Sequence, residues 1–247
     1  MIKTDKEIIK MRAVCKIVAK AHKYIESHIK PGVTTDYLDE ELEKFILSQG
    51  ARPNFKGYRK YPKTACISLN DVVVHGIPSE KNYLSEGDIV SVDVGAVKNG
   101  YHGDAARTYA VGKISLDLQK LIDITKECFF EGLKQAREGR RVGDISEAIQ
   151  KHAEANGYGV VRVLTGHGIG KKLHEAPSIP NFGKAGTGMQ LKSGMTLAIE
   201  PMINEGTFKV KFDCDGWTCR TEDGKMSAHY EETILVTNGE PEILTVV

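Results

Sequence analysis

The chain has 247 residues, of which 40% are hydrophobic, and this is ordinary for a globular protein of one or two domains. Its formal net charge is +1 at pH 7, so bulk charge indicates neither a nucleic-acid partner nor a membrane surface. No apolar run approaches the roughly 20 residues that cross a bilayer, and no secretory signal is visible. We therefore expect an enzyme-sized cytoplasmic protein.

Four segments carry helical patterns. Thr4 and Glu7 have the spacing of a capping box, and the apolar residues after them recur every three or four positions until Pro31. The next pattern ends at Gly50, a residue typical of helix ends. The predicted helices cover residues 4–29, 35–50, 117–137 and 144–156.

Strand-like runs lie between and after these helices. They cover residues 65–69, 88–97, 106–112, 160–164, 195–203 and 229–237. The resulting order is helices, strands, helices, strands, which suggests an internal repeat.

The numbering supports this repeat. An offset of 107 carries Asp93 onto Glu200, and several glycines and charged residues match at the same offset. Further along, an offset of 127 carries Asp104 onto Glu231, which implies a 20-residue insertion in the second half. We divide the one catalytic domain, residues 1–247, into halves of about 1–112 and 113–247.

The matched carboxylates carry the functional argument. Asp93 and Glu200 lie within apolar strand-like runs, where acidic residues are depleted. A buried ionised carboxylate must be paired or bind a metal, and one alone is often the partner of an arginine. Two pairs of carboxylates at equivalent positions of the repeat are harder to explain as partners of arginines. Because equivalent strands of a two-fold repeat lie about one axis, we expect all four carboxylates to converge.

Converging carboxylates repel one another unless cations neutralise them. Oxygen-rich sites suit Mn²⁺, and an imidazole ligand extends the choice to Fe, Co or Zn. His167 is the natural nitrogen ligand. Two ions that share bridging carboxylates would lie ~3.5–4 Å apart and activate a water between them.

The histidine stretch VLTGHGIGKKLHEAP, residues 163–177, holds His167 and His174. Glycines at positions 166, 168 and 170 oppose a helix, and the stretch matches neither a phosphate loop nor a dinucleotide fingerprint. The glycines indicate a close backbone approach or positive φ angles. A lone histidine is more often structural, but the carboxylates change that balance.

DVG…HGDAART, TGHGIGKKLHEAP, AIEPMI, HYEETILV and ISLNDVVVHGIP together closely resemble type I methionine aminopeptidases of the short bacterial form, over essentially the whole chain. The resemblance implies an α+β pita-bread fold, with two pseudo-symmetric halves and a central antiparallel sheet inside outer helices. It implies removal of the initiator methionine from nascent proteins whose second residue is small, with water activated by two metal ions. It also implies a cytoplasmic monomer that associates with ribosomes, and no nucleic-acid motif or membrane anchor is present.

The resemblance assigns metal ligands residue by residue. Asp93 matches a ligand of one ion, and Asp104 and Glu231 match carboxylates that bridge both ions. His167 and Glu200 match the remaining ligands of the second ion. Glu200 is also implied as a proton shuttle.

The resemblance assigns the substrate contacts as well. His75 and His174 match two histidines that contact the substrate and stabilise the tetrahedral intermediate. Leu173 stands where relatives often carry phenylalanine, so we expect a softer pocket wall there. The matching methionine-pocket residues are Tyr58, Tyr61, Cys66, Leu173 and Trp217, whose rings and sulfur suit a thioether. A monovalent-cation site matches Asn70, Val72 and Ser227, which ordinary loop hydrogen bonds explain equally well.

Two other functions compete with this one. An X-Pro peptidase of the same fold usually carries an additional N-terminal domain, for which this length leaves no room. A non-catalytic binding protein of this fold would have lost ligands, whereas all five ligand positions are intact. The five cysteines include no C-x-x-C pair, and we favour free thiols over a clip between Cys214 and Cys219.

Overall fold

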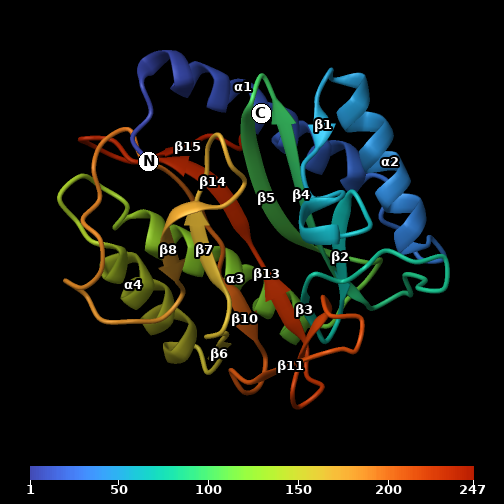
Figure 1. Ribbon diagram of the computed structural model, residues 1–247. Coiled ribbons are helices and arrows are strands. Elements are labelled where there is room, and N and C mark those ends of the chain that lie inside the picture. The colour runs from blue at the N-terminus through green and yellow to red at the C-terminus, as the bar shows by residue number, and fades with distance from the viewer.

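Four helices and fifteen short strands make up the computed structural model, which describes residues 1–247 (Figure 1). The predicted capping box is present, since the Thr4 N–H donates to the Glu7 carboxylate over 2.9 Å. The four predicted helices are confirmed as α1 (Asp5–Glu26), α2 (Thr35–Ser48), α3 (Leu116–Leu133) and α4 (Val142–Ala155). Each ends before its predicted limit, and α3 and α4 begin one and two residues earlier than predicted. Helix α3 stops before residue 137 because the chain turns, and the Glu138 N–H bonds the Thr237 carbonyl.

The main sheet has nine strands, and every pairing in it is antiparallel. Its order is β1-β4-β5-β14-β9-β7-β8, with β2 added to β4 and β15 added to β14. Its strands are β1 (Arg52–Pro53), β2 (Ala65–Leu69), β4 (Ile89–Lys98), β5 (Tyr101–Ala110), β7 (Thr165–Gly168), β8 (Glu175–Pro180), β9 (Thr196–Ile199), β14 (Glu231–Leu235) and β15 (Glu242–Ile243).

Two three-stranded sheets flank the main one. The first has the order β13-β10-β6, and the second has the order β11-β12-β3. Their strands are β3 (Val72–Val74), β6 (Gly159–Val160), β10 (Met202–Asn204), β11 (Val210–Phe212), β12 (Cys219–Thr221) and β13 (Ser227–His229).

The two halves of the chain correspond closely. Both ends of α4 lie 107 residues after those of α2, and β9 begins 107 residues after β4. The strand set β2-β4-β5 faces the set β7-β9-β14 across the seam between β5 and β14. In Figure 1, α2 and α4 lie on opposite sides of the central strands. Helices and strands thus recur at the offset read from the sequence, and the division at residue 112 stays a prediction.

Each helix pair covers its own hydrophobic cluster. Met11 of α1, Leu42 of α2 and Val92 of β4 are fully buried in the first cluster. Phe129 of α3 and Ile149 of α4 are fully buried in the second. None of the four helices combines the length and the apolarity that a bilayer crossing requires. All five cysteines are free thiols, so the clip between Cys214 and Cys219 is excluded.

Several predicted strands have different limits. The run at 195–203 breaks after Ile199, because Pro201 lacks the N–H that would continue the ladder. The run at 229–237 breaks at Tyr230, and the run at 106–112 belongs to a strand that already begins at Tyr101. Of the run at 160–164, only Val160 belongs to a strand, β6. Its pairing with β10 stops after the Val161 N–H bonds the Met202 carbonyl, because β10 starts at Met202. Strands β7 and β8 in the histidine stretch were not predicted.

Candidate active site and metal centre

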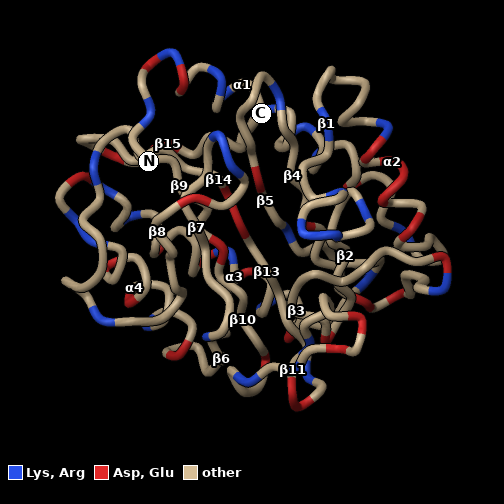
Figure 2. Tube along the Cα trace, viewed as in Figure 1, with Lys and Arg blue, Asp and Glu red and all other residues tan.

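Strand register brings three carboxylates onto one face of the main sheet. Ala106 of β5 pairs with Asp93 of β4 on one side and with Glu231 of β14 on the other. Asp104 lies two residues from Ala106 along β5, so its side chain points to the same face. Asp/Glu positions stand out on the central strands β5 and β14 in Figure 2, where the other charges lie mainly toward the periphery.

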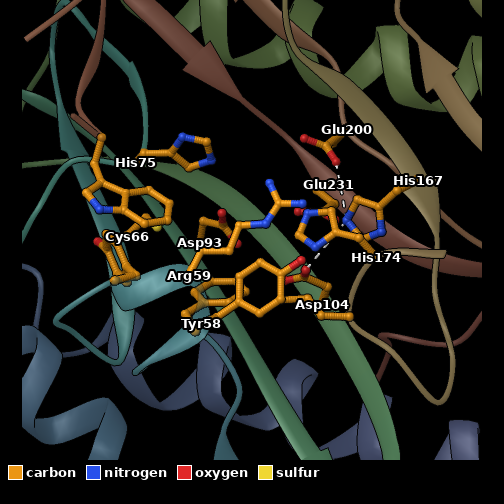
Figure 3. Close-up of a pocket in the computed structure, with 14 residues that line it drawn as sticks. Tyr58, Arg59, Cys66, His75, Asp93, Asp104, His167, His174, Glu200 and Glu231 are labelled. Carbon is orange, nitrogen blue, oxygen red and sulfur yellow. Dashed lines mark ion pairs between the residues drawn. The ribbon is translucent and has the colours of Figure 1, made fainter.

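The second half contributes a histidine and a fourth carboxylate. His167 of β7 pairs with Ala198 of β9, and Glu200 follows two residues later. The Nε2 atom of His167 lies 3.6 Å from Glu200 Oε1 and 3.9 Å from Asp104 Oδ2 (Figure 3). Ligand atoms of Asp104, His167 and Glu231 all lie within 4.8 Å of one another. This spacing suits a shared cation.

The histidine tautomer also suits metal binding. The Nδ1 atom of His167 lies 2.9 Å from the Gly168 carbonyl, which can only accept, so Nδ1 carries the proton. Burial, and then the neighbouring His174, lower the pKa of His167 to about 4. The imidazole is therefore neutral near pH 7, and its Nε2 lone pair faces the carboxylates.

Three oxygens of these carboxylates lack a hydrogen-bond partner inside the protein. Asp93 Oδ1, Asp104 Oδ1 and Glu231 Oε1 are buried without any hydrogen bond. Burial raises the pKa of Asp93 to about 7, and burial followed by repulsion between the carboxylates raises the pKa of Asp104, Glu200 and Glu231 well above the ordinary value of each. Carboxylate oxygens without hydrogen-bond partners, grouped around a neutral imidazole, are a ligand set for divalent cations. These residues therefore fit the metal that the fold family implies.

Two further histidines line the same pocket. The His174 ring stacks on Tyr58 at 5.2 Å and lies 4.1 Å from the His167 ring. His75 follows β3 with φ of 59°, and its ring lies edge-on to Trp217 at 6.0 Å. Burial, reinforced by His174, lowers the pKa of His75 to about 4. The imidazole of His75 is therefore neutral near pH 7 and keeps one N–H to donate.

The pocket wall opposite is aromatic and apolar. The Tyr61 hydroxyl donates to the carbonyls of Ala65 and Gly76, over 3.0 and 3.1 Å, so this ring is held in place. Cys66 is the cross-strand partner of Asp93, and burial raises the pKa of its thiol. The apolar wall therefore adjoins the carboxylates directly.

All twelve predicted site residues line this one pocket, whose empty volume including its open mouth is about 630 Å³. Two lining residues, Phe55 and Arg59, were missed. Phe55 continues the three-residue spacing of Tyr58 and Tyr61, which was a usable signal. Arg59 has φ of 47°, and its guanidinium reaches between His75 and His174 (Figure 3). No feature of the sequence predicted the direction of the Arg59 side chain.

The residues matched to a monovalent-cation site lie close together at the end of β13. The Ser227 N–H donates to the Asn70 carbonyl over 2.9 Å, and β13 lies against β3, which begins at Val72. The Asn70 amide donates to Asp88, and the Ser227 hydroxyl donates to Asn204. Hydrogen bonds within the protein thus account for both polar side chains.

The glycines of the histidine stretch are needed because neighbouring backbone approaches them closely, not because their φ angles are positive. None of Gly166, Gly168 and Gly170 lies in the left-handed region. A Cβ on Gly166 would lie 2.4 Å from the Ala198 carbonyl oxygen, and one on Gly168 would lie 2.3 Å from the Ala176 carbonyl oxygen. Glycine therefore lets β7 fit between β8 and β9 and carries His167 to the carboxylates.

Comparison with known proteins agrees with this geometry. The model of metallopeptidase family M24 matches residues 9–238. A methionine aminopeptidase of Clostridium acetobutylicum is 52% identical over 245 residues, covering 99% of this chain and 98% of that protein.

Solved structures give the same result. The crystal structure of methionine aminopeptidase from Rickettsia prowazekii superposes with a TM-score of 0.98 at 44% identity, covering 100% of this chain and 99% of that one. The Xaa-Pro dipeptidase from Bacillus anthracis superposes at 0.80 with 29% identity, covering 99% of this chain and 61% of that one. The expected pita-bread fold is confirmed.

Proposed function

The chain belongs to metallopeptidase family M24 and acts as a methionine aminopeptidase, and from this premise we propose that its substrates are nascent proteins whose second residue is small. We further propose that two divalent ions take part. One observation carries the proposal: a single pocket joins five metal-ligand candidates to an aromatic, sulfur-containing wall.

Five side chains would hold the ions: Asp93, Asp104, His167, Glu200 and Glu231. When bound, divalent ions supply Lewis-acid polarisation of the scissile carbonyl and activation of water. The raised pKa of Glu200, caused first by burial and then by Asp93, suits a group that accepts a proton from water and returns it to the leaving amine.

The two other histidines would handle the substrate. His75 and His174 are neutral near pH 7 because burial lowers the pKa of each ring, so each keeps an N–H to donate. Such a donor, aimed at the oxygen on which charge develops, is worth about 3–4 kcal/mol of barrier. Both rings line the pocket together with the carboxylates, which supports this role (Figure 3).

The residues of the pocket wall are suited to bind a methionine side chain, and those at the pocket mouth favour a small second residue. Tyr61, Cys66 and Trp217 offer rings and sulfur, against which a thioether packs favourably. At the mouth, the Arg59 guanidinium lies 5.5 Å from the Tyr58 ring, and that ring stacks on His174. This crowding supports discrimination against a large side chain after methionine.

The experiment is a metal-reconstitution assay. Protein stripped with a chelator is supplied with Mn²⁺, Co²⁺, Fe²⁺ or Zn²⁺ separately and assayed on Met-Gly-Met, Met-Leu-Met and Gly-Pro. We expect release of methionine from Met-Gly-Met only with added metal, at least tenfold faster than from Met-Leu-Met. A titration with an endpoint of two ions per chain would support the dinuclear site.

The other outcomes separate the alternatives. Hydrolysis of Gly-Pro without methionine release would favour the X-Pro peptidase. No hydrolysis by a folded, metal-loaded protein would favour the binding scaffold. Equal rates on Met-Gly-Met and Met-Leu-Met would contradict the size preference alone. Ribosome association, a monomeric state, a cytoplasmic location and the monovalent-cation site stay predictions.

A further inference from the structure

The hairpin of β11 and β12 lies in the part of the second half that has no counterpart in the first. The offset between the halves is 107 at Glu200 and 127 at His229, so the extra residues fall between them. This hairpin is turned by residues 213–218, and that turn carries Trp217, the one tryptophan of the chain. The segment that breaks the repeat therefore supplies part of the pocket wall.

The small sheet β11-β12-β3 explains how this tryptophan reaches the pocket. Cys219 at the start of β12 pairs with Val74 at the end of β3. Trp217 precedes the first of these residues and His75 follows the second, so both emerge at the same end of the sheet. The Trp217 ring lies edge-on to Tyr61 at 5.0 Å and to His75 at 6.0 Å.

The turn is shaped internally by one carboxylate. Asp215 accepts the N–H groups of Trp217 and Thr218, each over 2.8 Å, and the Thr218 hydroxyl over 2.6 Å. These bonds fix the local conformation of the turn. They all lie within the turn, so they do not fix where it sits against the first half of the chain.

Arg220 supplies that connection. Its Nε donates to Asp213 Oδ2 over 2.7 Å, and its Nη1 donates to Asp71 Oδ1 over 3.0 Å. Asp213 follows β11 and Asp71 precedes β3, so one guanidinium on β12 ties all three strands together. The backbone ladder between β12 and β3 shifts register at Arg220, between Cys219 and Arg220. The side chain thus bridges the strands where the backbone pairing is interrupted.

We propose that Arg220 is a positioning residue for the methionine pocket, because it holds the inserted hairpin on β3 and so sets Trp217 against His75 and Tyr61. The inference deepens the proposed function and rests on it for the role of Trp217 in substrate binding. Arg220 itself does not line the pocket, so its effect reaches the substrate only through the turn.

The test combines tryptophan emission with kinetics on the metal-loaded enzyme. In Arg220→Met we expect a red-shifted emission of Trp217 and at least twofold greater quenching by acrylamide. KM for Met-Gly-Met should rise about 3- to 10-fold with kcat within about twofold, as for loss of binding shared by ground and transition states. Arg220→Lys keeps a cation between the two aspartates and should recover most of both effects.

Arg12→Met is the matched control, since Arg12 makes a two-bond ion pair with Glu242 over 2.7 Å, away from the pocket. It should change neither emission nor KM. Wild-type emission and KM in Arg220→Met would overturn the proposal, as would a loss of kcat at unchanged KM. If Arg220→Met does not fold, Asp213→Asn must show the same changes at smaller amplitude. If the wild type releases no methionine, the proposed function fails, while emission still tests the role of Arg220.

Discussion

The carboxylates of the pocket repel one another, and this repulsion is the main unfavourable interaction at the scale of single residues. Four carboxylates share the site with one neutral imidazole, and three of their oxygens have no partner. Protons relieve this repulsion in the absence of cations, which is why the pKa values of these carboxylates are raised. Divalent ions would relieve it at neutral pH and release those protons.

We expect Asp104→Asn to stabilise the metal-free protein and to weaken metal binding. In the metal-free wild type the Asp104 carboxyl must either repel its neighbours or take up a proton, and a neutral amide avoids both costs. The free energy of unfolding without metal should therefore rise by about 1–3 kcal/mol. In the wild type, Mn²⁺ at 100 times its dissociation constant should add about 2.7 kcal/mol. That gain should nearly vanish in the variant. Melting curves with chelator and with increasing Mn²⁺ measure both effects.

Asp123→Asn, an exposed change on α3, is the control and should leave both curves in place. A variant that melts below the metal-free wild type would contradict the repulsion argument.

Sequence reasoning singled out residues whose chemistry conflicts with their surroundings. Asp93 stood out because its neighbours are apolar, and the repeat then pointed to the other carboxylates. Arg59 was not predicted as a pocket residue, because an arginine between two tyrosines has no distinctive sequence pattern. Its left-handed backbone turns the side chain inward only in the folded protein. The direction of a side chain in an irregular loop depends on contacts distant in sequence.

Among the elements, β7 shows how packing overrides propensity. It is built from Thr-Gly-His-Gly, which has little strand preference, yet it pairs with both β8 and β9. Its glycines are required by the carbonyls on either side.

We therefore expect Gly168→Ala to damage both the fold and the site. Its new Cβ would lie 2.3 Å from the oxygen and 2.8 Å from the carbon of the Ala176 carbonyl, and backbone atoms cannot yield easily. The free energy of unfolding should fall by about 1–3 kcal/mol, as for other overpacked sites, and Mn²⁺ affinity should fall because His167 moves. Urea unfolding and Mn²⁺ titration measure the two.

Gly239→Ala provides the comparison, because the nearest heavy atom to its Cβ would be 3.9 Å away. Equal losses in both variants would show that close packing at β7 is not the cause.

Helix α1 carries a pH-sensitive contact with β5. His22 is fully buried, with its ring nitrogens 2.9 Å from the Tyr109 hydroxyl and from the Ala105 carbonyl. Burial, and then Arg107, lower the pKa of His22 to about 3. The folded protein therefore holds the His22 ring in its neutral form. The contribution of this ring to folding stability is complete above the unfolded pKa of ~6.5 and is lost as pH falls toward 3.

We expect His22→Gln to flatten this acid response. Between pH 6.5 and 4, wild-type stability should fall by up to about 1.4 kcal/mol per pH unit more than that of the variant, which takes up no proton. Urea unfolding at half-unit pH steps gives the two slopes, and parallel slopes would contradict the argument.

Elements with a strong periodic pattern were predictable, and interrupted ones were not. Helices α2 and α4 fall close to their expected limits because apolar spacing and terminal glycines define them locally. The break after β13 arises where the chain passes from the small sheet β13-β10-β6 to β14 of the main sheet. A change of partner strand is a property of the assembled protein, so local sequence carries little sign of it.

Across the whole molecule, the candidate ligands are divided between the halves. Asp93 and Asp104 come from the first half, and His167, Glu200 and Glu231 come from the second. The seam between β5 and β14 brings them together.

We expect neither half to work alone. Fragments 1–112 and 113–247, made separately, should release no methionine and should bind Mn²⁺ at least 100-fold more weakly than the full chain, because each lacks ligands and exposes a seam strand. Calorimetric titration and the Met-Gly-Met assay measure this. Full affinity in either fragment would contradict the two-half site.

The same division sets an order in time. During its own synthesis the chain acquires its candidate ligands in the order 93, 104, 167, 200 and 231, so the fifth arrives 138 residues after the first. Throughout elongation the growing chain therefore holds an incomplete ligand set. An enzyme that removes the first residue of other chains therefore has its own candidate ligand set complete only after Glu231 has been made.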